Sequence, residues 1–120
     1  MQVLIVEDHA DSRRALERFL AACGFDVSSA HDLASGRQLL QEREFGAIVS
    51  DIALPDGTGY ALISEARSRG VNTFAIALSA YDFPVDVQEA KVTGFDHHLK
   101  KPIDLTKLRT LLETAASHSP

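Results

Sequence analysis

Charged or hydroxyl side chains follow four short segments of this sequence, three of which are apolar. Glu7 and Asp8 follow "VLIV", Asp51 follows "AIVS", Ser79 follows "FAIAL", and Lys101 follows "FDHHLK". A buried carboxylate is costly unless a hydrogen bond or an opposite charge compensates for the lost water. If the three acids converge, each pair repels by about 1 kcal/mol at 4 Å even in water. These residues therefore predict a site that holds a cation.

The ligand types indicate which cation this is and what it could support. Carboxylate oxygens suit Mg²⁺, which takes one or two carboxylates together with a phosphate oxygen, and Mn²⁺ is a possible substitute. One divalent ion and Lys101 would neutralise the three acids. A carboxylate such as Asp51 can attack an activated phosphorus to form an acyl phosphate. Lys101 and the Ser79 hydroxyl would then neutralise charge on the transferring oxygens.

The rest of the chain alternates short apolar runs with amphipathic segments, which is typical of βαβ units. Five strands and five helices are expected. On the first helix, the residues Ala15, Leu16, Phe19, Leu20 and Cys23 form the inward face. The expected strands are Val3–Val6, Phe25–Ser29, Ala47–Ser50, Phe74–Leu78 and Phe95–Leu99. The expected helices are Ser12–Cys23, Leu33–Gln41, Gly59–Arg69, Pro84–Thr93 and Leu105–Ala116. Gly24, Gly70 and Gly94 are the expected stops of the first, third and fourth, and Asp104 is the expected N-cap of the last.

The composition of the strands predicts their order. The first, third and fourth are continuously apolar, as expected when helices cover both faces, whereas the second and fifth are more polar and suit the sheet edges. Right-handed crossovers then favour a flavodoxin-like, doubly wound, parallel α/β sheet of five strands in the order 2-1-3-4-5. Ligands of such sheets bind beyond the carboxyl ends of the strands, where the polar groups lie.

Length and composition narrow the class of protein. Residues 1–120 fit one domain, and a net charge of −5 with scattered basic residues argues against direct nucleic-acid binding. Cys23 is the only cysteine, so no internal disulfide forms and a reducing compartment is favoured. The sequence has no signal-peptide pattern and no apolar run of about 18 residues, so no membrane contact and a cytoplasmic location are expected.

The sequence resembles the receiver domain of two-component response regulators over essentially its whole length. The resemblance rests on "IVEDHADS", "SDIALPDGTG", "ALSA" and "HLKKP" in this order and spacing. It implies that Asp51 accepts a phosphoryl group from a phosphohistidine on a sensor histidine kinase or a histidine phosphotransfer protein. It also implies a phosphoacceptor domain that promotes only its own phosphorylation and dephosphorylation.

The resemblance further assigns roles to individual residues. Asp8 and Asp51 would bind Mg²⁺ together with the carbonyl of Ala53, and Glu7 would assist through water. Lys101, rather than Lys100, would form the ion pair because it directly precedes Pro102, and this Lys-Pro bond is expected to be cis. Ser79 is the expected hydroxyl switch residue, although Ser79 or Asp82 as a cap of the following helix is an alternative.

Two positions depart from the family pattern. Three residues before Lys101 the family usually has Tyr or Phe, whereas this chain has His98, which is either a pH-sensitive gating residue or a half-buried edge-strand histidine. Ala53 has no side-chain amide to position an attacking water, while Tyr81 would shield the site. A long-lived acyl phosphate is therefore expected.

The expected output surface comprises helix Pro84–Thr93, strand Phe95–Leu99 and helix Leu105–Ala116, which a partner would read, with phosphorylation-dependent dimerisation as a possible result. The segment "GFDHHLKKP" is similar to receivers of hybrid sensor histidine kinases. Fusion to such a kinase or to another output domain is therefore favoured over a stand-alone receiver.

Other classes of protein fit less well. A phosphatase of the haloacid dehalogenase type needs a second Asp where Ala53 stands, and no glycine-rich phosphate loop follows the first strand. The serious alternative is a pseudo-receiver that acts only as a protein interaction module. Several polar residues outside the site are predicted to be structural, capping or solvated, namely Asp56, Lys100, His9, His31, His97 and His118.

Overall fold

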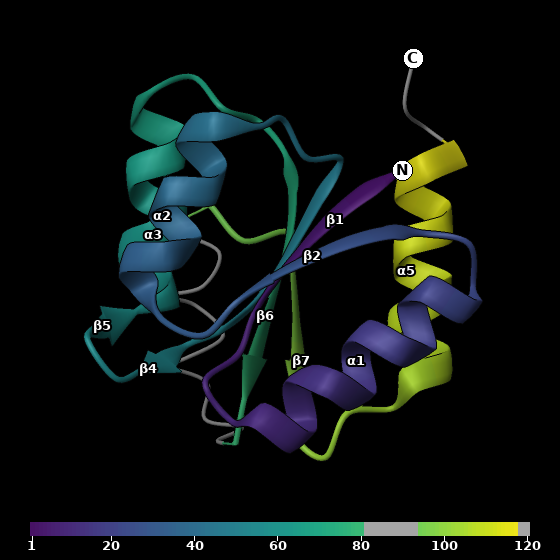
Figure 1. The fold of residues 1–120 in the computed structure, drawn as a ribbon. Coiled ribbons are helices and arrows are strands. Elements are labelled where there is room, and N and C mark those ends of the chain that lie inside the picture. The colour runs from purple at the N-terminus through teal and green to yellow at the C-terminus, as the bar shows by residue number, and fades with distance from the viewer. Residues whose placement is uncertain (81–93, 118–120) are drawn as a thin grey trace.

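A computed structural model describes residues 1–80 and 94–117 of the chain. At its centre is a five-stranded parallel sheet in the order β2-β1-β3-β6-β7 (Figure 1). This is the predicted 2-1-3-4-5 order, with β6 and β7 as the fourth and fifth expected strands. The strands are β1 (Gln2–Val6), β2 (Asp26–Ala30), β3 (Ala47–Asp51), β6 (Phe74–Ser79) and β7 (His97–Lys100).

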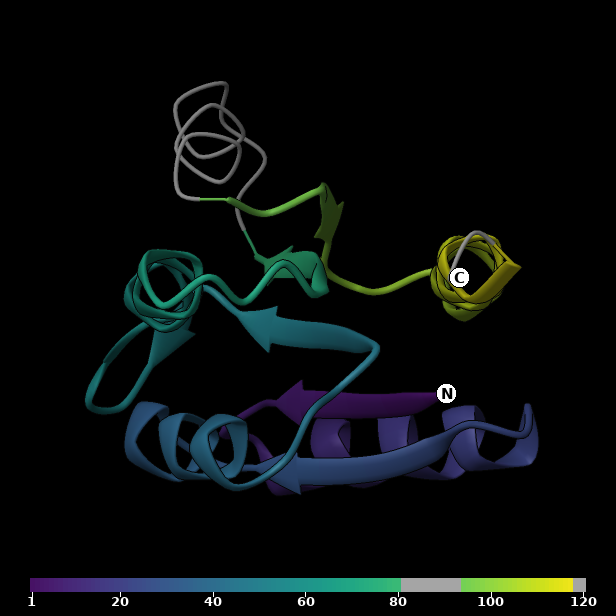
Figure 2. The ribbon, with the colours of Figure 1, turned by 90° about the horizontal axis from the view of Figure 1, so that it is seen from above.

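Helices cover both faces of the sheet. Figure 2 shows α2 and α3 on one side of the sheet and α1 and α5 on the other. The expected helix Pro84–Thr93, together with Tyr81 and Asp82, lies outside the described residues. The bounds of the described helices are α1 (Ala10–Ala22), α2 (Leu33–Glu42), α3 (Gly59–Ser68) and α5 (Leu105–Ser117).

Side chains along each strand point alternately to the two faces of the sheet, and this divides the core into two layers. In β1, Val3 and Ile5 pack toward α1 and α5, whereas Leu4 and Val6 pack toward α2 and α3. Burial of one such side chain contributes about 1.5–3 kcal/mol. The predicted inward face of α1 is only partly correct. Leu16 and Leu20 are buried, Phe19 and Cys23 are half-buried, and Ala15 is exposed at the margin of the apolar stripe.

The two outer strands have the expected character. The first four residues of β2 are exposed or half-buried, and in β7 only Leu99 is buried, whereas β3 is buried throughout. This difference follows from the number of neighbours, because an edge strand has a partner on one side only.

The described residues contain no helix that is both long and apolar enough to cross a bilayer.

A short hairpin after β3 was not predicted. β4 (Ala53–Leu54) and β5 (Gly57–Thr58) pair antiparallel around a turn that contains Pro55 and Asp56. The sequence indicated only the turn, since strands of two residues are too short to show a period. The predicted stops and cap are confirmed: Gly24 and Gly70 have φ of +95° and +82° after α1 and α3, and Asp104 Oδ1 accepts the Lys107 N–H of α5 at 3.2 Å. The predicted start of the first helix at Ser12 is wrong, since α1 begins at Ala10.

Candidate functional site

The parallel sheet brings the predicted polar residues together at the carboxyl ends of its strands. Glu7 follows β1, Asp51 ends β3, Ser79 ends β6, and Lys101 follows β7. Cα pairing places Asp51 opposite Leu78, the neighbour of Ser79. Residues far apart in the chain meet here because all parallel strands run in the same direction.

An ion-paired cluster lies at the centre of this edge. The Lys101 Nζ atom lies 2.7 Å from Asp51 Oδ1, and 3.3 Å and 3.2 Å from the two carboxylate oxygens of Glu7. Glu7 has no exposed surface and Asp51 is 3% exposed. The Lys101 amide donates to the Ser79 carbonyl at 2.7 Å, and the Lys101–Pro102 peptide bond is cis, as expected. One cation thus compensates two buried acids.

Compensation of the Asp51 charge is incomplete. Burial raises the pKa of the Asp51 carboxyl, while the nearby ammonium of Lys101 lowers it by less. Oδ1 of Asp51 has the ammonium as its ionic neighbour but no well-aligned hydrogen bond among the described residues. A buried carboxylate in this condition is suited to a further positive ligand.

Asp8 and His9 extend the acidic cluster toward solvent. One potential ligand atom each from Glu7, Asp8 and His9 lies within 4.8 Å of the others. Nδ1 of His9 is 3.4 Å from Asp8 and 3.9 Å from Glu7, and His9 is also the N-cap residue of α1. His9 is exposed and at a cap, as predicted, but its contact with the acids was not anticipated, although its position directly after them was a signal.

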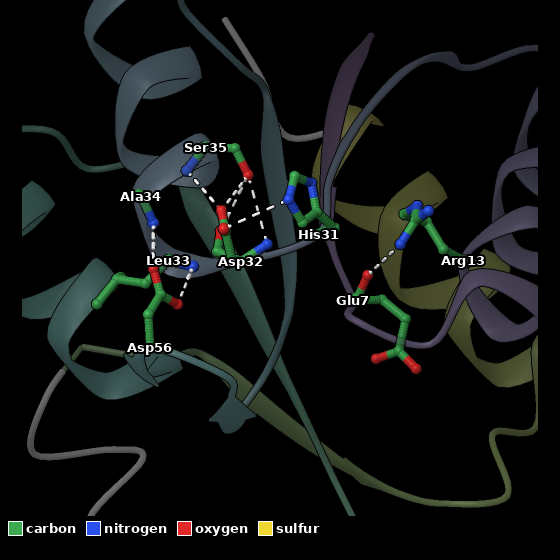
Figure 3. A network of polar contacts seen from close by, with 8 residues as sticks. All are labelled: Glu7, Arg13, His31, Asp32, Leu33, Ala34, Ser35 and Asp56. Carbon is green, nitrogen blue, oxygen red and sulfur yellow. Dashed lines mark hydrogen bonds and ion pairs between the residues drawn. The ribbon is translucent and has the colours of Figure 1, made fainter.

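Hydrogen bonds fix the backbone that carries the acids. The Arg13 guanidinium donates from Nη1 to the Glu7 carbonyl at 3.0 Å (Figure 3), and the Glu7 amide donates to Ala30 of β2 at 3.0 Å. Arg13 was not singled out in the sequence, because an arginine in the first turns of an amphipathic helix is ordinary. These two hydrogen bonds hold the connection between β1 and α1 against α1 on one side and β2 on the other.

The chain after Asp51 turns back sharply. The Gly59 amide donates to the Ile52 carbonyl at 2.9 Å, and a Cβ atom on Gly59 would lie 2.3 Å from the Asp51 carbonyl oxygen. Only glycine permits this approach. Thr58 then caps α3 by accepting the Ala61 N–H at 3.2 Å. The segment between Asp51 and Gly59 is therefore a closed loop next to the acidic cluster.

A cavity of about 280 Å³ opens beside Asp51. Ser79 at its wall is 7% exposed. The cavity brings together four of the predicted site residues and is small and largely apolar away from the charges. Its lining includes Asp51, Ala53, Thr58, Ser79, Ala80 and Lys101.

His98 is not among the residues that line this cavity. It is half-buried on β7, and its Nε2 atom is buried without a hydrogen-bond partner among the described residues. The prediction of a half-buried histidine on an edge strand, without a gating role, fits this position. The alternative prediction of a gating role is not tested by the geometry.

The donor set fits a hard divalent cation. The observation that supports the fit is the buried Asp51 Oδ1 atom, which lacks a well-aligned hydrogen bond, next to the carboxylate of Glu7. Asp8 is half-buried and offers a further carboxylate near Glu7. Carboxylate-rich sites of this kind suit Mg²⁺ or Mn²⁺.

Comparison with known proteins identifies the family. A family model of the response regulator receiver domain matches residues 3–113. The chain belongs to this family. This receiver is 36% identical over 115 residues to the response regulator protein PilR of Pseudomonas aeruginosa, a match that covers 95% of this chain and 26% of PilR. It is 28% identical over 116 residues to the sensor histidine kinase RcsC of Escherichia coli, covering 97% of this chain and 12% of RcsC.

Solved structures show the same fold. The receiver domain of Francisella response regulator 1452 superimposes with a TM-score of 0.95 at 24% identity, covering 99% of this chain and 98% of that chain. The chemotaxis response regulator CheY4 of Vibrio cholerae gives 0.88 at 27% identity, covering 95% and 97%. The receiver thus spans about a quarter of PilR and an eighth of RcsC, but nearly all of each of these solved chains.

Proposed function

We propose that this receiver accepts a phosphoryl group on Asp51 from a phosphohistidine, in a Mg²⁺-dependent reaction. The observation that carries the proposal is the position of Lys101, whose ammonium contacts the buried carboxylates of Asp51 and Glu7 at once. The cavity beside Asp51, with Ser79 in its wall, offers space for a phosphoryl group. No observation favours the alternative of a phosphorylation-independent pseudo-receiver.

The chemistry follows from the groups present. A carboxylate oxygen of Asp51 attacks phosphorus, so that a P–O bond forms while the P–N bond to the donor imidazole breaks, and the released imidazole takes up a proton from solvent. The Lys101 ammonium and the Ser79 hydroxyl stabilise charge on the phosphoryl oxygens. Asp51 is the residue modified, so the receiver promotes only its own phosphorylation and dephosphorylation and is not a general enzyme.

Four groups would hold the cation. Asp8, Asp51 and the carbonyl of Ala53 would bind Mg²⁺ or Mn²⁺, and Glu7 would act through water. When bound, the ion neutralises negative charge on the carboxylates and the phosphoryl oxygens. Glu7 also keeps the Lys101 ammonium in place at 3.2 Å, which orients Lys101 toward the neighbouring carboxylate.

The proposed partner is a sensor histidine kinase or a histidine phosphotransfer protein. RcsC is a sensor histidine kinase with a region similar to this chain, which supports fusion to a hybrid kinase or another output domain. We propose that residues 1–120 form a single receiver domain and act in the cytoplasm, where kinases form phosphohistidine from ATP. We propose no direct contact with nucleic acid or membrane, and phosphorylation-dependent dimerisation as one possible output.

We propose that Ser79 and His98 link phosphorylation to the partner-binding surface, which would include β7 and α5. The buried Nε2 atom of His98, without a partner among the described residues, supports a side chain that changes its environment. The test compares the affinity of phosphorylated wild type and His98→Tyr for the cognate kinase or phosphotransfer protein between pH 6 and pH 8. A gating imidazole predicts curves that diverge with pH, and parallel curves would contradict it.

Intact-mass spectrometry tests the phosphoacceptor proposal. The protein is incubated with Mg²⁺ and acetyl phosphate or phosphoramidate, and a gain of one phosphoryl group is expected. Asp51→Asn should abolish the gain, whereas Asp26→Asn, a change at an exposed residue that begins β2, should leave it intact. No gain in the wild type would favour the pseudo-receiver.

A further inference from the structure

A long-range contact joins the loop after Asp51 to the start of α2. Oδ1 of Asp56 accepts the Leu33 N–H at 2.7 Å, and Oδ2 accepts the Ala34 N–H at 3.0 Å (Figure 3). Asp56 belongs to the turn between β4 and β5, more than twenty residues further along the chain. The predicted structural role of Asp56 agrees with this contact, but its partner could not be read from the sequence.

The start of α2 has a second, local carboxylate. Oδ1 of Asp32 accepts the Ser35 N–H at 2.8 Å, and the Ser35 hydroxyl also lies near the Asp32 backbone amide. The first three amides of α2 are therefore all paired, two by Asp56 and one by Asp32. The two acids thus divide the capping of one helix, but only Asp56 connects that helix to the loop after Asp51.

The loop is held at both ends. At its base, the Ile52 amide donates to the Leu78 carbonyl at 3.0 Å, and the Gly59 amide donates to Ile52. At its tip, Asp56 bonds to α2, and Gly57 packs so closely against Leu33 that a Cβ atom would lie 2.6 Å from Leu33 Cδ2. Between these points lies the β4–β5 ladder of two residue pairs.

Ala53 stands between the base and the tip. It pairs with Thr58 in this ladder, is exposed, and has only a methyl side chain. Its carbonyl, the proposed metal ligand, is therefore positioned by the backbone alone. Any loosening of the hairpin tip would be transmitted to this carbonyl through the backbone of the two intervening residues.

We propose that Asp56 is a positioning residue for the divalent-cation site, acting through the hairpin to hold the Ala53 carbonyl. This inference rests on the proposed function, since it assumes that the cation binds at Ala53. Residues that orient metal ligands from outside typically change metal affinity by 10- to 100-fold when removed. Because two residues of backbone separate Asp56 from the one ligand it acts on, the lower end of this range is expected.

The test measures Mg²⁺ affinity by isothermal titration calorimetry for the wild type, Asp56→Ala, Asp56→Asn and Asp32→Ala. Asp56→Ala should bind Mg²⁺ about tenfold more weakly. Asp56→Asn, which keeps one of the two acceptor oxygens, should recover part of the affinity. Asp32→Ala is the matched control, because it removes one carboxylate from the same helix end without touching the hairpin, and it should bind within about twofold of the wild type.

Two results would overturn the inference: Asp56→Ala binding Mg²⁺ as tightly as the wild type, or Asp32→Ala weakening binding as much as Asp56→Ala does. Amide chemical shifts of Ala53, Leu54 and Gly57, recorded without metal, give a second readout and should move in Asp56→Ala but not in Asp32→Ala. A wild type that binds Mg²⁺ but takes no phosphate would refute the proposed phosphoacceptor function and leave this comparison valid. A wild type that binds no Mg²⁺ would refute both.

Discussion

Replacing Asp51 with Asn is expected to stabilise the metal-free protein at neutral pH. Asp51 is buried, and burial raises the pKa of its carboxyl despite the nearby Lys101. The folded protein therefore holds this proton more tightly than the unfolded chain does. The free energy of unfolding consequently falls as pH rises from the unfolded pKa to the folded pKa, and it stays lowered above both. An Asn side chain removes this cost of ionisation.

Two electrostatic effects oppose each other at Asp51. At an effective dielectric constant of about 20, the attraction across the 2.7 Å to Lys101 is about 6 kcal/mol. Removing an ion from water costs several kcal/mol for each ion. The upward direction of the pKa shift indicates that desolvation outweighs the attraction. Lys101 is also not left unpaired in the variant, because Glu7 remains 3.2 Å away.

The expected gain is about 0.5–2 kcal/mol, the range common for single stabilising substitutions. For a domain of this length, it corresponds to an increase of roughly 2–10 °C in melting temperature. Circular dichroism during heating, at pH 7 with a chelator present, measures this increase, and Asp26→Asn serves as the exposed control. The difference should shrink as the pH falls toward the unfolded Asp pKa of about 4. A lower melting temperature for Asp51→Asn at pH 7 would refute the reasoning, because the ion pair with Lys101 would then outweigh desolvation.

Three further predictions concern the surrounding backbone. The Ser35 hydroxyl and amide hold the pKa of Asp32 below its usual value, so Asp32→Ala should be less stable than the wild type to urea at pH 7. The difference in the free energy of unfolding should disappear as pH falls through the folded pKa of Asp32, and a difference that stays constant with pH would contradict this. Gly59→Ala places a methyl group 2.3 Å from the Asp51 carbonyl oxygen and should lower the free energy of unfolding by about 1–3 kcal/mol, measured by equilibrium denaturation. Unchanged stability would show that the loop relaxes freely. Ala53→Asn supplies an amide that can position water, so it should shorten the lifetime of the acyl phosphate, which mass spectrometry measures. A wild-type lifetime of only seconds that is unchanged in the variant would argue against a shielded site.

Much of the fold could be predicted because its signals are local. Continuous apolar runs identified β1, β3 and β6 as inner strands, and the more polar β2 and β7 were placed correctly at the edges. Helix ends followed from Gly24, Gly70 and Asp104, whose backbone and side-chain preferences act over a few residues. The β4–β5 hairpin was missed because its pairing depends on the loop around it and not on a sequence period.

The residues of the candidate site were also predictable, but their contacts were not. Alternation of strands and helices implies that Glu7, Asp51 and Lys101 share one edge of the sheet, since parallel strands end on the same side. The sequence could not show that one ammonium touches both acids, or that His9 joins the cluster. These details depend on side-chain directions set by packing across several elements.

The fold class, the strand order and the residues that gather at the carboxyl end of the sheet follow from the sequence alone, because apolar periodicity and chain connectivity act along the chain. The burial of each acid and the amides to which it hydrogen-bonds follow from the folded structure. Asp56 and Asp32 illustrate the difference: both are acids near turns, yet Asp32 caps its own helix and Asp56 caps the same helix from more than twenty residues away. Burial and long-range hydrogen bonds are properties of the assembled chain, and no local pattern contains them.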